Sequence, residues 1–170
     1  MAWFTEFRVD DDTEPHMICF FITLNYRLHD KSLLAIEQEA AWCEGCRRFG
    51  SAEVIPSIEE LKARVQELQT PTQKLLFIYR TQEAIRGAIA ELHTRLRWRA
   101  DRKSSARCLA CGSTAITPVR FGEDRTCVVN GKRLTESGQG FADTADWIAE
   151  YTPEGIATSG PTSQRTKRST

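Results

Sequence analysis

Four of the six cysteines form two Cys-x-x-Cys pairs, and these residues have the clearest chemistry in the chain. Cys43 and Cys46 lie in AAWCEGCRRFG, and Cys108 and Cys111 lie in ARCLACGSTAI. Two thiolates spaced in this way can bind one ion, and a glycine behind them helps the backbone fold beneath it. A redox dithiol is the alternative, but it favours a helix N-terminus in a βαβ setting. Neither pair has that setting, so we favour metal binding.

The stretch CLACGS resembles one half of a zinc ribbon, and the two pairs together supply four thiolates. The pattern predicts one structural Zn²⁺ per chain, bound tetrahedrally by Cys43, Cys46, Cys108 and Cys111. Four thiolates leave no open coordination position, so a catalytic role for the metal is not expected. The chain departs from the ribbon pattern because 61 residues separate the two pairs, against about 15–20 in a compact site.

The remaining two cysteines, Cys19 and Cys127, leave an alternative open. Two separate sites could each be completed by one of these thiols or by a histidine. Both residues lie in apolar runs that are typical of strands, where a cysteine more often acts as a small buried hydrophobic residue. We therefore interpret them as packing residues and favour the single shared site.

A capping box marks a helix start between the two pairs. Ser57 and Glu60 have the spacing of this motif, and apolar residues follow at three- and four-residue intervals, which predicts a helix over 58–69. A second capping box begins at Thr70, and it has proline at the first helical position. It predicts a helix over about 71–103. The seam of this helix is Leu75, Ile78, Gln82, Ile85, Ile89, Leu92 and Leu96.

These two helices predict an antiparallel hairpin, inserted at about 57–103, whose dimensions let the cysteine pairs meet. The shorter helix would rise about 18 Å and the longer about 50 Å. The connecting segment RRFGSAEVIPS has 11 residues and spans about 36 Å when extended, which makes up the difference. We expect Phe49, Val54 and Ile55 of this segment to cover the part of the seam that the short helix cannot reach.

The flanking regions read as short strands. We predict strands over 2–9 and 16–28, and a hairpin around Asn130-Gly131, whose residues suit a type I′ turn. The segment 31–41 predicts a short helix, although its last residues could instead form a strand that enters the first cysteine pair. The segment 141–151 is ambiguous between helix and strand.

Together these elements predict an α+β fold, with a small antiparallel β region, a split four-cysteine zinc-ribbon-like site and an inserted antiparallel helical hairpin. We expect one domain over 1–157. From 158 to 170 the chain is polar and basic without an apolar anchor, so a disordered tail is predicted there.

Charge is segregated along the chain although the net charge is zero. Residues 1–60 carry 12 acidic and 5 basic side chains, whereas residues 61–120 carry 12 basic and 4 acidic ones. Eight cations would gather near the end of the long helix and the predicted site, where they could form an anion-binding or nucleic-acid face. Alternatively, the acidic segment neutralises them. These cations are Arg47, Arg48, Arg95, Arg97, Arg99, Arg102, Lys103 and Arg107.

No catalytic motif accompanies the cysteines, so we expect a non-catalytic protein rather than an enzyme. Neither a nucleophile elbow nor a phosphate-binding glycine loop occurs, and the three histidines are scattered. The N-terminus lacks the features of a signal peptide and no apolar run could span a bilayer, which favours a cytoplasmic protein without a membrane partner. We predict an adaptor, regulator or immunity-type protein that binds another protein. A nucleic-acid-binding protein is the alternative.

Overall fold

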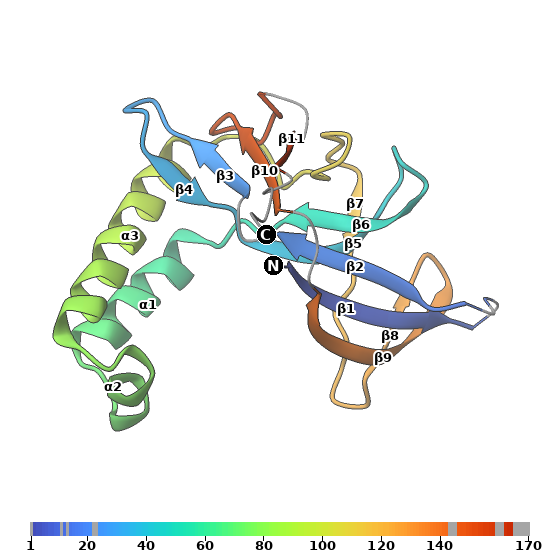
Figure 1. Ribbon diagram of the computed structural model, residues 1–170, viewed down its shortest axis with the longest axis horizontal. Helices are drawn as coiled ribbons and strands as arrows, with labels where there is room; N and C mark the ends of the chain where they lie inside the picture. Colours follow the sequence, from blue (N-terminus) through green and yellow to red (C-terminus); the bar gives the residue numbers. More distant parts are fainter. Residues whose placement is uncertain are drawn as a thin grey trace, which may run out of the picture.

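The computed structural model describes residues 2–10, 12, 14–21, 24–142, 146–158 and 162–164. Its architecture is α+β, as predicted, with three sheets of mainly antiparallel strands, three helices and a four-cysteine cluster. Figure 1 shows that the helices project together from one side of the β region, away from β8 and β9. We call α1, α2 and α3, residues 58–101, the helical arm.

The first sheet is a four-stranded antiparallel layer that joins strands from residues 2–21 with strands from residues 126–142. Its hairpin at Asn130-Gly131 is confirmed, since both residues have the positive φ angles (53° and 75°) of a type I′ turn. The predicted strand over 2–9 is also confirmed. The strand order is β2 (His16–Phe21), β1 (Ala2–Val9), β9 (Lys132–Ala142) and β8 (Thr126–Val129).

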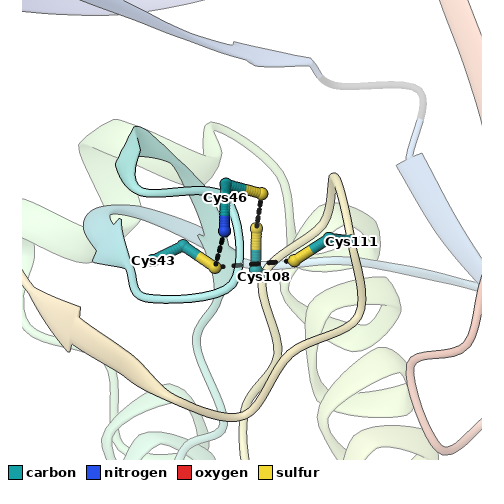
Figure 2. Close-up of side chains that lie close together, drawn as sticks. All are labelled: Cys43, Cys46, Cys108 and Cys111. Carbon is teal, nitrogen blue, oxygen red and sulfur yellow. Dashed lines mark hydrogen bonds between the residues drawn. The ribbon is translucent and has the colours of Figure 1, made fainter.

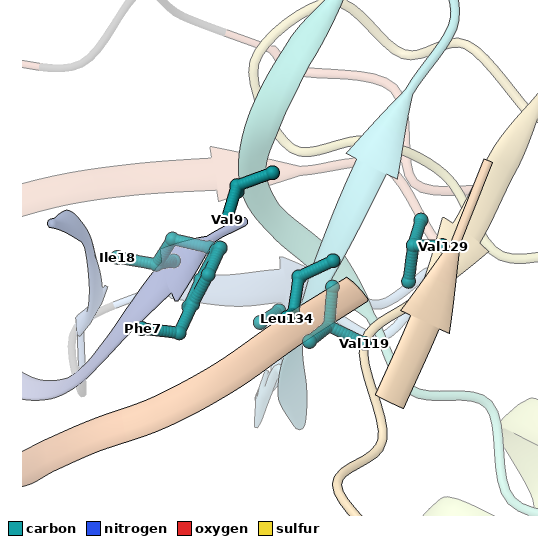
Figure 3. Packing of buried hydrophobic residues seen from close by; sticks show 7 residues of the cluster. Phe7, Val9, Ile18, Val119, Val129 and Leu134 are labelled. Carbon is teal, nitrogen blue, oxygen red and sulfur yellow. The ribbon is translucent and has the colours of Figure 1, made fainter. Parts of the chain in front are cut away.

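One face of this sheet packs against the strands that carry the first cysteine pair. Phe7 is fully buried, and its ring meets Phe49 edge-on with 5.0 Å between centroids. Figure 3 shows the apolar side chains of this core converging between the strands. Phe49 therefore belongs to this core, and the prediction that it covers the helical seam is wrong. Ile55 packs instead near Trp98 in a second core.

The other two sheets connect this body to the arm. In the second, the order is β11 (Thr162–Gln164), β10 (Asp146–Tyr151), β3 (Leu24–Arg27) and β4 (Leu33–Ala35). In the third, it is β6 (Arg48–Glu53), β5 (Gln38–Cys43) and β7 (Ile116–Pro118). The predicted strand over 16–28 is thus two strands, β2 and β3, which belong to different sheets. Within the ambiguous segment 141–151, the described residues are strand, and 143–145 lie outside them.

The helix predicted over 31–41 is wrong, because these residues form β4 and the start of β5. Before β4, Asp30 accepts hydrogen bonds from the backbone N–H and the hydroxyl of Ser32 and so stabilises a turn. Leu34 and Ile36 are buried in the second core, with Tyr26 and Trp98. The alternative that the last residues form a strand entering the first cysteine pair is confirmed by β5.

The helical arm is a hairpin of α1 (Ile58–Gln69) and α3 (Gln82–Asp101), with α2 (Gln73–Tyr79) between them. The first helix has the predicted bounds and its capping box. The second predicted helix is wrong as a continuous helix, because the chain breaks between α2 and α3. Arg80 has a φ of 60° there, and the Thr81 side chain caps α3 by accepting a hydrogen bond from the Ala84 N–H. Within the described residues, no helix has the length and apolar character needed to cross a membrane.

The predicted disordered tail is described only in part. Thr162–Gln164 forms β11, which pairs with β10. Residues 159–161 and 165–170 lie outside the described residues.

Candidate metal centre

The first cysteine pair lies in the turn of the β5–β6 hairpin. Cys43 is the last residue of β5, where it pairs with Arg48 of β6 on one side and with Ile116 of β7 on the other. The turn brings the backbone N–H of Cys46 to 3.4 Å from the sulfur of Cys43. Pairing on both edges of β5 therefore fixes the position of this corner.

The second pair lies in a turn that leans on the open edge of β6. Cys108 forms an isolated β-bridge with Ala52, and the Leu109 N–H donates to the Ser51 carbonyl at 3.1 Å. Gly112, directly after Cys111, has a φ of 72°, and its N–H closes the turn on the Cys108 carbonyl at 2.8 Å. This positive φ explains the glycine behind the pair.

The two turns bring all four sulfur atoms within 4.8 Å of one another, across the 61-residue insertion. The Cys43 and Cys111 sulfurs are 3.5 Å apart, and those of Cys46 and Cys108 are 3.8 Å apart (Figure 2). A tetrahedral site with Zn–S bonds of about 2.3 Å has sulfurs about 3.8 Å apart. The four predicted ligands are therefore brought together with a spacing that could hold a metal ion. We call these residues and their turns, 43–46 and 108–111, the cysteine clasp.

No protein-family model, curated protein or solved structure matches this chain.

The environment of the clasp shifts the pKa values of its thiols in opposite directions. A hydrogen bond from the Ser113 N–H lowers the pKa of Cys111 to about 7. Hydrogen bonding to Cys111, followed by burial, raises the pKa of Cys46 to about 12, and burial raises the pKa of Cys108. Without metal, Cys46 and Cys108 are therefore protonated at neutral pH, whereas Cys111 is partly a thiolate.

Metal binding should consequently release protons, because only thiolates are ligands. We expect about two protons or more per bound Zn²⁺ near neutral pH, and an affinity that falls by about a hundredfold per pH unit on acidification. Titration of the metal-free protein with Zn²⁺ in weak buffer, followed with a pH indicator, measures the release. An affinity that stays constant from pH 7.5 to 6 would contradict this protonation scheme.

A buried ion pair lies beside the clasp and holds the arm to it. The guanidinium of Arg102, just after α3, makes a two-bond contact with the Glu53 carboxylate of β6 at 2.7 and 3.1 Å, and both side chains are fully buried. Tyr26 donates to the same carboxylate at 2.8 Å. The Arg107 backbone N–H, one residue before Cys108, donates to it at 2.8 Å. One carboxylate thus contacts the helix end, the β3 strand and the entrance to the second cysteine pair.

Aromatic rings and the turn after β10 enclose this pair. The rings of Tyr26 and Trp98 stack with 4.7 Å between centroids, and the Arg102 guanidinium lies 5.5 and 5.2 Å from them. Trp98 donates its ring N–H to the Pro153 carbonyl. Gly155 has a φ of 76°, and a Cβ atom there would collide with the Glu53 carboxylate. Neither Glu53 nor this turn has a local sequence signal, because the contacts join residues 49 and 102 positions apart.

Of the eight cations predicted to form an anion-binding face, two are buried in ion pairs. Arg102 is buried against Glu53, and Arg95 is buried, donating to the Ala35 carbonyl and pairing with Glu91 and Glu37. These two arginines are paired with Glu37 and Glu53 of the acidic segment, as the alternative of neutralisation predicts.

The other six cations differ in their contacts and exposure. Arg107 donates to the Glu154 and Gly112 carbonyls, and Arg99 donates to the Pro56 carbonyl. The exposed cations are Arg47, Arg48, Arg97 and Lys103. Nucleic-acid contact through these exposed side chains stays a prediction.

The other candidate ligands lie outside the cluster. Cys127 packs partly buried against the first core, and burial raises its pKa, in keeping with a packing role. Cys19 is partly exposed on β2. His16 stacks on Phe7. Among the described residues, the one group of cysteine, histidine or acidic side chains close enough to hold a metal is the clasp.

Proposed function

We propose that this chain is a zinc-stabilised binding protein, in which the clasp holds one structural Zn²⁺ and the helical arm presents a surface to a protein partner. The observation that carries the proposal is the four-sulfur cluster, whose spacing fits a closed tetrahedral site. Four thiolates select a soft or borderline ion such as Zn²⁺ over Mg²⁺ or Ca²⁺. With four protein ligands the ion has no open position for water, which supports a structural rather than a catalytic role.

The helical arm supports the choice of a protein partner. Leu75 and Tyr79 of α2 turn inward and pack against the apolar seam between α1 and α3. Three consecutive apolar side chains then point outward: Leu76, Phe77 and Ile78 are 42%, 82% and 56% exposed. We call these three residues the arm tip. They lie at the end of the arm that is farthest from the β region (Figure 1). Contiguous exposed apolar side chains are typical of protein interaction sites.

The placement of the arm explains what the metal contributes to this function. Both legs of the arm begin close to the clasp, since β6 leads from Cys46 to α1, and only six residues lie between α3 and Cys108. A bound metal would therefore fix the base of the arm, and with it the direction in which the tip is presented. The proposed roles of metal and arm are thus connected through the chain.

The arm tip is tested by changing Phe77 to alanine. We expect the affinity for the partner, recovered from the native host and then purified, to fall about thirtyfold, the effect of losing an aromatic anchor worth about 2 kcal/mol. Val128→Ala is the matched control, because Val128 is 69% exposed but lies on the β region. Both variants should keep their zinc. Equal binding by the wild type and the Phe77 variant would contradict a role for the tip.

A further inference from the structure

Two close sulfur contacts in the clasp run between its two halves. Cys43 approaches Cys111 at 3.5 Å, and Cys46 approaches Cys108 at 3.8 Å. Figure 2 shows each of these sulfur pairs meeting across the space between the two turns. Each contact therefore joins residues that are more than 60 positions apart, and the geometry favours bonds between the halves.

The two halves are also held together by contacts that do not involve sulfur. Next to Cys43, the Glu44 N–H donates to the Ala115 carbonyl at 3.0 Å, and β5 pairs with β7. Next to Cys108, the Leu109 N–H donates to the Ser51 carbonyl, and the Glu53 N–H donates to the Arg107 carbonyl at 3.0 Å. These backbone bonds tie each turn to the strands of the other half, so loss of a metal would not by itself separate the sulfurs.

Gly45 lets the first turn lie directly on the second. A Cβ atom at this position would be 3.1 Å from the Ser113 Cβ and 3.3 Å from the Cys111 sulfur. Real Cβ atoms rarely come this close to their neighbours, so the two turns are in contact at this point. The halves of the clasp therefore have little room to shift past each other before their sulfurs react.

We propose that oxidation of the clasp by a peroxide releases the metal and forms two disulfides across it, Cys43–Cys111 and Cys46–Cys108. The expected alternative for paired cysteines is one disulfide within each Cys-x-x-Cys, which would leave no covalent bond between the halves. The crossed disulfides would keep them joined. This inference deepens the proposed function, because it makes the base of the arm resistant to oxidation.

Each disulfide uses one peroxide molecule. The Cys111 thiolate attacks a peroxide oxygen, the O–O bond breaks, and the sulfur becomes a sulfenic acid while hydroxide leaves and takes up a proton as water. The Cys43 thiolate then attacks this sulfur, the S–S bond forms, the S–O bond breaks, and a second hydroxide leaves and is protonated. Cys46 and Cys108 react in the same way, so four thiols are oxidised, two peroxides become four waters, and the metal loses all its ligands.

Digestion of the oxidised wild-type chain with trypsin under non-reducing conditions tests this directly. Both cysteines of the first half lie in one tryptic peptide, 32–47, and both of the second half lie in another, 108–120. Crossed disulfides give one linked species, whereas disulfides within each pair give two separate peptides, each lighter by two hydrogens. Cys19 and Cys127 fall in other peptides, so a disulfide to either of them is distinguished by its mass. A chelating dye follows zinc release in the same sample.

We expect the linked species to account for most of the oxidised clasp after treatment with hydrogen peroxide. Cleavage after Glu44 and after Leu109 then separates the four cysteines and should show Cys43 joined to Cys111. Separate peptides, sulfinic acids or the opposite pairing would overturn the proposal. If the purified protein releases no zinc, the proposed metal role fails, yet the peptide map still decides which disulfides form.

Two double variants give an independent test of rate. Cys46→Ser with Cys108→Ser keeps only the crossed contact, and Cys108→Ser with Cys111→Ser keeps only the pair within one turn. We expect the first to form its disulfide at least about tenfold faster at equal peroxide, because its sulfurs already lie 3.5 Å apart. Equal rates, or a faster second variant, would contradict the proposal. If neither variant folds, the peptide map of the wild type decides alone.

Discussion

Replacing Cys43 or Cys108 by serine is expected to remove the bound zinc almost completely, from about one ion per chain to near zero. Both residues are buried and come from opposite halves of the clasp, so a shared site depends on each of them. Structural zinc contributes on the order of 10 kcal/mol to folding in small zinc domains. At about 2–4 °C per kcal/mol for a chain of this size, a loss of this free energy would lower the thermal unfolding midpoint by about 20–40 °C. Elemental analysis and calorimetry measure the two effects.

Cys19→Ser is the matched control for these variants. This thiol lies on β2, outside the four-cysteine cluster, so its loss should leave both the zinc content and the unfolding midpoint close to those of the wild type. Two separate metal sites make a different prediction, because Cys43→Ser would then leave the ion at the other pair in place. Retention of about half the metal or more in either variant would therefore refute the shared site.

The second large effect is expected at the buried ion pair, where Glu53→Gln leaves the Arg102 guanidinium without a counter-charge. Both side chains are fully buried, and removing one partner of such a pair costs about 3–5 kcal/mol. The carboxylate also accepts from Tyr26 and from the Arg107 N–H. We therefore expect the free energy of unfolding, measured with urea on the zinc-loaded protein, to fall by this amount.

Glu39→Gln is the matched control, because Glu39 makes the same kind of two-bond contact with Arg120 from a neighbouring strand. There the arginine side chain is 73% exposed, and water screens the interaction. Exposed pairs contribute at most about 1 kcal/mol, so this variant should stay close to the wild type. Equal effects of the two substitutions would show that burial of the Glu53 pair does not set its energetic contribution.

The features that the sequence predicted are those encoded by neighbouring residues. Helix α1 begins and ends where its capping box and apolar spacing place it, because these signals act within four residues. The hairpin at Asn130-Gly131 follows from the positive φ angles that these two residues adopt readily. The four ligands were identified because Cys-x-x-Cys is itself a local pattern. The predicted geometry of their meeting was wrong, because the long helix is broken at Arg80 and residues 48–53 of the connecting segment form β6.

The features that the sequence did not predict depend on contacts between residues that are far apart in the sequence. The segment 31–41 has helical spacing, but pairing of β4 with β3 and of β5 with β6 outweighs this local preference. The break between α2 and α3 had a signal, since Thr81 is a good N-cap, but the apolar seam continued through it and hid the boundary. The partnership of Glu53 with Arg102 spans 49 residues and has no sequence motif.

The helical arm has a consequence for the order of events in folding. The Arg99 side chain donates to the Pro56 carbonyl at 3.1 Å, so the two ends of the hairpin lie side by side. Helices and their local contacts form within microseconds, long before distant segments pair. Once the hairpin exists, the loop to be closed between Cys46 and Cys108 shrinks from 61 residues to those flanking the arm. By the logarithmic dependence of closure entropy on length, this lowers the cost of assembling the clasp by about 1 kcal/mol. The insertion that separates the two cysteine pairs in sequence thus lowers the entropic cost of bringing them together.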